Sequence, residues 1–138
     1  MATEIPAGNQ NITLLSSNGP AIQTANVVVP PLAPGSKNQL TVTATGIQTW
    51  EAFYPGTAIV PANVFLQVGQ DVNDDTGLPD QYALQYIGWN NAGSNDLQVT
   101  FRIMRIDVLY DTSPPPDVGW DQYLLVNILL LTQGIQTG

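Results

Sequence analysis

The acidic side chains are the residues best able to do chemistry in this sequence, because it contains no histidine and no cysteine. Histidine is the side chain that moves protons near neutral pH, and cysteine is the readiest nucleophile, so most catalytic mechanisms are not available to this chain. Two carboxylates that flank a sugar bond do suffice for glycoside hydrolysis. Here the eleven Asp and Glu residues are dispersed, and nothing in their context singles out such a pair. We therefore expect a protein that is not an enzyme.

The densest acidic segment begins at Asp71 and offers one further kind of chemistry. Asp71, Asn73 and Asp75 have the alternating spacing with which calcium loops begin, and calcium prefers several oxygen ligands on one turn. The pattern then departs from such loops: the glycine is Gly77 instead of the sixth residue, and Tyr82 stands where a bidentate glutamate is needed. A solvated turn with Asx caps is the favoured interpretation, and bound calcium is the alternative. No other cofactor is expected.

The three tryptophans are candidates for ligand contact, because each lies beside an acid, an amide or a glycine. An aromatic ring next to Asn or Asp suits a sugar, since the ring packs on C–H groups and the polar groups fix hydroxyls. The same rings also serve in protein interfaces or pack at the rim of a β-sandwich. We expect Trp120 to be exposed, because it follows a stiff run of prolines. The candidates for a ligand platform are Trp50, Trp89, Trp120 and Asp121.

The charge of the chain excludes two classes of partner. Lys37, Arg102 and Arg105 are the cations, against eleven carboxylates, and the formal net charge is −8. Binding to nucleic acids or to anionic membrane surfaces depends on clustered cations. The longest apolar run, within residues 124–131, is too short to cross a bilayer. We therefore expect neither nucleic acid nor membrane as a partner.

The elements that must carry these residues are strands. Eleven Pro and twelve Gly are spread over the whole chain, and the windows between them are rich in Val, Thr, Ile, Leu and Tyr, which is typical of strands separated by turns. Residues 39–45 alternate between apolar and polar, which predicts a strand with one buried face. Dense turn residues at 90–96 predict a hairpin. Further strands are expected at 11–15, 25–29, 63–68, 81–89, 97–110 and 122–132.

Two of these expected strands have unusual patterns. Between 97 and 110 the apolar residues change from odd to even positions, which predicts a β-bulge near Arg105. Arg105 can pair with a carboxylate across an interface or form an ordinary surface ion pair with Asp107. The last strand is apolar on both faces, which predicts that it is central in its sheet or covered by another subunit. The candidates for interface residues are Tyr123, Leu125, Leu129, Leu131 and Arg105.

Together these features predict an all-β protein, an antiparallel β-sandwich of about seven or eight strands, for which a jelly roll is one fitting connectivity. We expect one sandwich domain at residues 11–132, an extended N-terminal arm at residues 1–10 and a polar C-terminal tail at residues 133–138. The first residues have neither a basic nor an apolar region of a signal peptide, so we expect synthesis in a host cytoplasm without one.

In size, composition and expected build, the chain resembles the decoration (cement) proteins of phage capsids, which are small, rich in β-structure and poor in cysteine. The resemblance implies a structural protein of the virion surface that acts through protein–protein contacts, as a homotrimer and with other capsid or virion proteins. The acidic balance fits an outer layer of the particle. The alternative is an oligomeric carbohydrate-binding lectin, in which several weak glycan sites add up to useful avidity. A phage tail-tube subunit is the second alternative.

Overall fold

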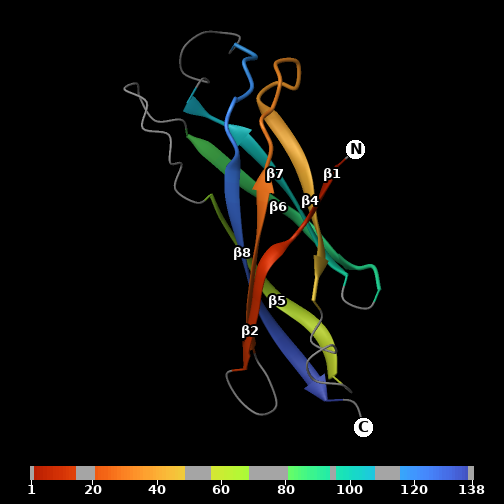
Figure 1. Cartoon of the computed structure of the whole chain (residues 1–138). Coiled ribbons are helices and arrows are strands. Elements are labelled where there is room, and N and C mark those ends of the chain that lie inside the picture. Colours follow the sequence, from red (N-terminus) through yellow and green to blue (C-terminus); the bar gives the residue numbers. More distant parts are fainter. Residues whose placement is uncertain are drawn as a thin grey trace.

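Two four-stranded sheets pack face to face in the computed structural model, which describes residues 2–14, 21–48, 57–68, 81–93, 96–107 and 116–136 (Figure 1). One sheet has the order β1 (Thr3–Pro6), β4 (Gln39–Ile47), β7 (Leu97–Arg105) and β6 (Tyr82–Asn91). The other has the order β2 (Gly8–Leu14), β3 (Ala21–Val29), β8 (Leu124–Gln136) and β5 (Thr57–Val68). Since the described residues contain no α-helix, the predicted all-β sandwich is confirmed. The jelly-roll connectivity stays a prediction.

Alternating side chains on β4 and β7 build the core side of the first sheet. Val42 pairs with Phe101, and both side chains are fully buried. On the opposite face, Thr43 pairs with Thr100, and their hydroxyl oxygens lie 2.9 Å apart. This is the arrangement that a period of two produces when one face of a sheet is covered. The alternation predicted for residues 39–45 is confirmed.

The strands β6 and β7 form the predicted hairpin, with Asn91 paired to Leu97 across the turn. The predicted bulge in the second of these strands is wrong. Because β7 ends at Arg105, the change of parity there marks the end of a strand. The register of this hairpin shifts on the partner strand instead, between Tyr86 and Gly88. Residues 108–110, which formed the last part of the predicted strand, lie outside the described residues.

The N-terminal segment pairs with both sheets. It runs parallel to β4 as β1 and then antiparallel to β3 as β2. Where the chain passes from one sheet to the other, the Ala7 N–H donates to the Thr45 carbonyl at 2.9 Å. The segment expected to be an arm is therefore extended but belongs to the sandwich. The expected C-terminal tail likewise begins inside a strand, because β8 pairs with β5 as far as Gln136.

The strand β8 is central in its sheet, as its two apolar faces predict, since it lies between β3 and β5. Its even-numbered side chains from Leu124 to Leu130 point into the core and are at most 1% exposed. Its odd-numbered side chains point to the opposite face, and Leu125 there is 39% exposed. The core of this chain thus explains why the inner face of β8 is apolar, but it does not explain the apolar side chains on the outer face.

Candidate interaction surface

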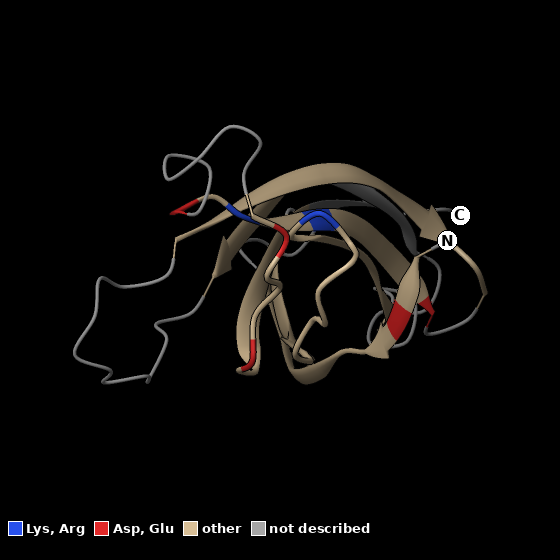
Figure 2. Ribbon diagram, turned by 90° about the horizontal axis from the view of Figure 1, so that it is seen from above, with Lys and Arg blue, Asp and Glu red and all other residues tan. Residues whose placement is uncertain are grey.

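One of the two sheets carries no charged residue. All eleven acids and three cations lie outside the strands β2, β3, β8 and β5, whereas the other sheet carries Glu4, Arg102 and Arg105. Viewed from above, long stretches of the ribbon carry neither the blue of Lys and Arg nor the red of Asp and Glu (Figure 2). Sheets that face water usually place polar and charged residues outward, and edge strands in particular use charges to block association. We call β2, β3, β8 and β5 the charge-free sheet.

The outer face of the charge-free sheet carries several large apolar side chains. Val28 on β3 lies opposite Leu125 on β8, and Phe65 on β5 lies opposite Leu129. Val28 and Phe65 are 51% and 54% exposed, although both are large apolar side chains. Leu129 and Leu131 are half-buried on the same face. Single exposed apolar residues are ordinary, but several of them on one face of a sheet are typical of an interaction site.

A row of amides crosses this apolar face from one edge strand to the other. Asn26 on β3 is the direct neighbour of Asn127 on β8, which is in turn the neighbour of Gln67 on β5. On the other side, the Asn9 side-chain amide donates to Asn26 Oδ1 at 3.3 Å. These four residues, which we call the amide row, line a groove of about 360 Å³ together with Phe65 and its neighbours. The groove is neutral, so it suits a partner that is itself uncharged.

The structure brings most of the predicted interface residues to one place. Leu125, Leu129 and Leu131 share the outer face of the charge-free sheet, on alternate positions of β8. Tyr123 directly precedes this strand and is 69% exposed. Their role as interface residues stays a prediction, but their position on one uncharged face is compatible with it.

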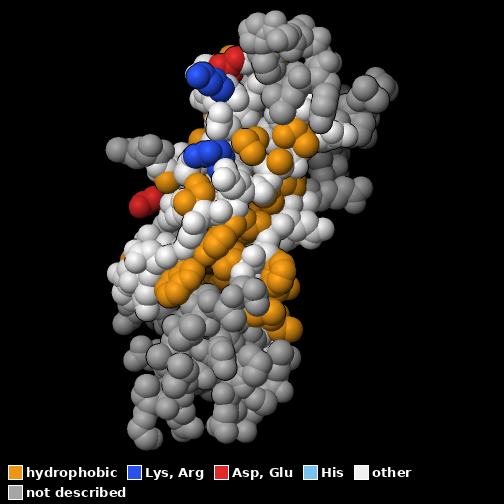
Figure 3. Space-filling model, turned by 180° about the vertical axis from the view of Figure 1, so that it is seen from behind, with side chains coloured by type: hydrophobic (Ala, Val, Ile, Leu, Met, Phe, Trp, Pro, Cys, Tyr) orange, Lys and Arg blue, Asp and Glu red, His pale blue; other side chains and the backbone are white. Residues whose placement is uncertain are grey.

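A second group of exposed apolar residues lies on the edge strand of the other sheet. Tyr86, Ile87 and Trp89 on β6 are 40%, 49% and 43% exposed. Hydrophobic side chains form a diagonal band on the face of the molecule seen from behind (Figure 3). Among the platform candidates, Trp89 therefore has a ring that a ligand can reach. Trp50 lies outside the described residues, as does the candidate calcium segment that begins at Asp71.

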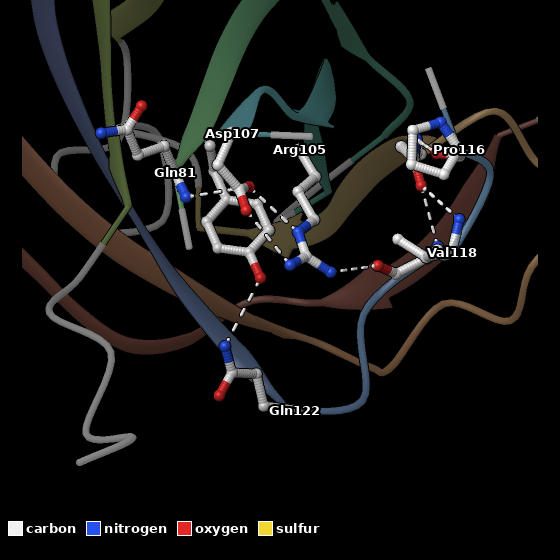
Figure 4. Close-up of polar contacts among 9 residues, drawn as sticks. Gln81, Arg105, Asp107, Pro116, Val118 and Gln122 are labelled. Carbon is white, nitrogen blue, oxygen red and sulfur yellow. Dashed lines mark hydrogen bonds and ion pairs between the residues drawn. The ribbon is translucent and has the colours of Figure 1, made fainter. Parts of the chain in front are cut away.

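Arg105, the remaining interface candidate, is engaged inside its own chain (Figure 4). Its Nε and Nη2 donate to the two carboxylate oxygens of Asp107 at 3.0 and 3.1 Å, and its Nη1 donates to the Gly119 carbonyl at 2.8 Å. Burial raises the pKa of Asp107, but hydrogen bonds from Arg105 and from the Gln81 N–H, with the arginine charge, outweigh this and lower it. Of the two interpretations, the ion pair with Asp107 is the one that the structure contains.

Trp120 belongs to the core, so the prediction that it is an exposed platform is wrong. Its side chain is 3% exposed, and its ring meets Tyr82 edge-on at 5.5 Å between ring centroids. Its indole N–H donates to the Pro30 carbonyl at 3.1 Å. Its backbone forms a two-way bridge with Leu32, with N···O distances of 2.8 and 2.9 Å. The neighbouring platform candidate Asp121 is exposed. Because the ring of Trp120 is buried, it cannot form a ligand platform together with Asp121.

The chain matches no protein-family model, no curated protein and no solved structure. Among the described residues, no group of three or more acidic side chains is placed to hold a metal ion. No helix in that part of the chain is long and apolar enough to cross a membrane. The function must therefore be inferred from the surfaces themselves.

Asn38 is a structural residue that the sequence analysis missed. It is 4% exposed and has a φ of +60°, a conformation that asparagine tolerates better than most residues. Its Nδ2 donates to the Pro116 carbonyl at 2.6 Å. Its Oδ1 accepts from the Val118 and Gly119 N–H groups at 2.9 and 2.8 Å. Asn38 thereby fixes the loop that carries Trp120 into the core, and a lone Asn in a turn gives no sequence signal for this.

Proposed function

We propose that this protein is a non-enzymatic structural component of a virus particle, a decoration or outer-surface protein of a phage capsid that acts through protein contacts of its charge-free sheet. The observation that carries the proposal is the lack of any charged residue on four strands whose outer face exposes Val28, Phe65 and Leu125. Because apolar surface gains about 25 cal/mol per Å² when it leaves water, such a face favours association.

The distribution of charge supports the same proposal. None of the acidic residues lies on the four strands of the charge-free sheet, so a partner that packs on these strands covers no charged side chain of theirs. Taking an unpaired charge out of water costs several kcal/mol, and this face avoids that cost. The net charge of −8 also suits an outer layer better than a shell surface that touches packaged nucleic acid.

A pair of matched variants tests the proposal. Leu129→Asp places a charge in the middle of the outer face of the charge-free sheet, on its central strand β8. Thr41→Asp places the same charge on the outward side of β4, a central strand of the other sheet, and is the control. We expect light scattering to show an assembled wild-type protein and an assembled Thr41→Asp variant. The Leu129→Asp variant should keep its circular dichroism spectrum and lose assembly.

Two results would contradict the proposal. One is a Leu129→Asp variant that assembles as well as the wild-type protein. The other is a wild-type protein that stays monomeric and also binds no virus particle. The virion context has its own test in the genomic neighbourhood: we expect flanking capsid and portal genes, and a lone cassette with secretion genes would argue against a particle component.

A lectin remains the second candidate function, and one observation favours it. Trp89 is 43% exposed, and Asn91, two residues further along β6 and on the same face of the strand, is also exposed, so an aromatic ring and an amide lie together at the end of β6. If the protein is a lectin, Trp89→Ala should abolish the signal on a glycan array with little effect on stability. If it is a structural protein, no glycan should bind at millimolar concentration.

A further inference from the structure

We propose that a second copy of this chain packs face to face on the charge-free sheet about a two-fold axis, with the amide row of each copy against the amide row of the other. The inference rests on the proposed function, because it uses the same surface and names its partner. It replaces the homotrimer expected from the sequence with a two-fold dimer as the building unit.

The amide row is chemically suited to meet a copy of itself. In a two-fold interface the same patch contributes both sides, so the patch must be self-complementary. Each side-chain amide carries two N–H donors and one carbonyl acceptor, whereas a row of carboxylates or of cations would repel its own copy. Gln67 is exposed and Asn127 is half-buried, so a partner can reach both amides. Two amide rows can therefore satisfy each other without any charged group.

The residues on both sides of the amide row are also compatible with this packing. The pair Val28 and Leu125 lies on one side of the row, and the pair Phe65 and Leu129 lies on the other. A two-fold axis that lies between the sheets and passes through the row brings each apolar flank either onto itself or onto the other flank. An axis that runs along the row brings Leu125 of one copy onto Leu129 of the other, at the separation of about 10 Å that packed sheets adopt.

The face is large enough for a stable dimer. Four strands at a spacing of about 4.8 Å, and the nine residues of β3 at about 3.4 Å each, outline a projected area of about 590 Å². Side chains that protrude give the face a larger accessible area than its projection. A standard interface buries about 800 Å² of accessible surface on each partner. The area of the charge-free face is thus of the size that a specific interface uses.

The outer face of the other sheet is a poorer partner for the charge-free sheet. It carries Arg102, whose Nη1 donates to Gln85 Oε1 at 3.3 Å, beside the Thr43 and Thr100 pair. Covering Arg102 with an apolar face would remove its hydration without supplying a carboxylate. A ring of copies pairs two different surfaces, for example the charge-free sheet with this face, so the two-fold arrangement is favoured.

Opposite charges at one position of the amide row test the proposal. Asn127→Asp and Asn127→Lys each place an unpaired charge near the expected axis, where the two copies of the residue approach each other. Each variant alone should raise the dimer dissociation constant about a hundredfold or more in sedimentation velocity. An equal mixture of the two variants at low salt should recover the dimer. The matched pair Thr41→Asp and Thr41→Lys should dimerise like the wild-type protein throughout.

Three outcomes would overturn the inference. The first is a wild-type protein that stays monomeric at high concentration. If that monomer still bound virus particles, the proposed function would stand although the dimer did not. Unchanged dimers of Asn127→Asp would show that the row is not buried. Failure of the mixture to recover dimers, when each variant alone is monomeric, would indicate a contact between two different surfaces. If a variant at position 127 does not fold, the same exchange at the exposed Gln67 replaces it.

Discussion

Removing the side chain of Asn38 should destabilise the protein although this residue lies outside the apolar core. In Asn38→Ala the Pro116 carbonyl loses its donor, and the N–H groups of Val118 and Gly119 lose their acceptor. The Gly119 N–H is itself buried, so water cannot simply replace the lost oxygen. The loop that these bonds hold carries Trp120, whose buried ring packs edge-on against Tyr82.

The size of the effect follows from these contacts. Three hydrogen bonds at a net value of about 1 kcal/mol each give about 3 kcal/mol. Alanine at a φ of +60° costs about a further 1 kcal/mol, because its Cβ crowds the backbone in the left-handed region. We therefore expect Asn38→Ala to lower the free energy of unfolding by about 4 kcal/mol.

Urea denaturation followed by tryptophan fluorescence measures this loss. Asn38→Asp is the matched control, since it keeps the acceptor for the two N–H groups, tolerates the positive φ and loses the donor to Pro116. Because it loses one hydrogen bond and also turns a carboxylate oxygen toward the Pro116 carbonyl oxygen, we expect a loss of about 2 kcal/mol, which is less than alanine loses. A loss below about 1 kcal/mol for Asn38→Ala would refute the role assigned to these hydrogen bonds.

Two further predictions concern the same end of the sandwich. Trp120→Ala should lower the free energy of unfolding by about 4 kcal/mol, as for other buried aromatic residues, and Trp120→Phe should lose less; thermal unfolding that is unchanged in Trp120→Ala would contradict its burial. The pKa of Asp107 is lower in the folded protein than in the unfolded chain, where it is about 3.9. Its pairing with Arg105 therefore contributes stability at a pH above the unfolded value, and this contribution is lost as the pH falls through the folded pKa. Unfolding measured from about pH 6 to about pH 2 should therefore be less pH-dependent in Asp107→Asn, and identical profiles would contradict the ion pair.

The strands could be predicted from the sequence where local pattern and tertiary burial agree. Residues 39–45 alternate because one face of β4 is covered, and the turn residues after Asn91 close a hairpin between neighbours in the chain. The break near Arg105 was misleading, since the end of a strand and a bulge both change the parity of an apolar pattern. Local patterns thus predict the elements better than their ends.

The burial of Trp120 could not be predicted from its neighbours. Prolines and glycine around it are typical of an exposed loop, but the backbone bridge to Leu32 and the bond to Pro30 come from residues distant in sequence. The charge-free sheet could not be predicted from the sequence for a different reason. The four uncharged segments are visible in the sequence, but strands that are not consecutive share this sheet, so their common face depends on long-range pairing. The same holds for the amide row.

Hydroxyl-radical footprinting of Phe65 tests most directly whether another chain covers the charge-free sheet. The measurement compares the oxidation rate of Phe65, which is 54% exposed in the isolated chain, with that of Tyr86, which is 40% exposed on the other sheet. In the assembled protein, alone or on a particle, Phe65 should be protected relative to the Leu129→Asp variant while Tyr86 is not. Oxidation of Phe65 at the same rate in the assembled protein and in that variant would contradict an interface on this sheet.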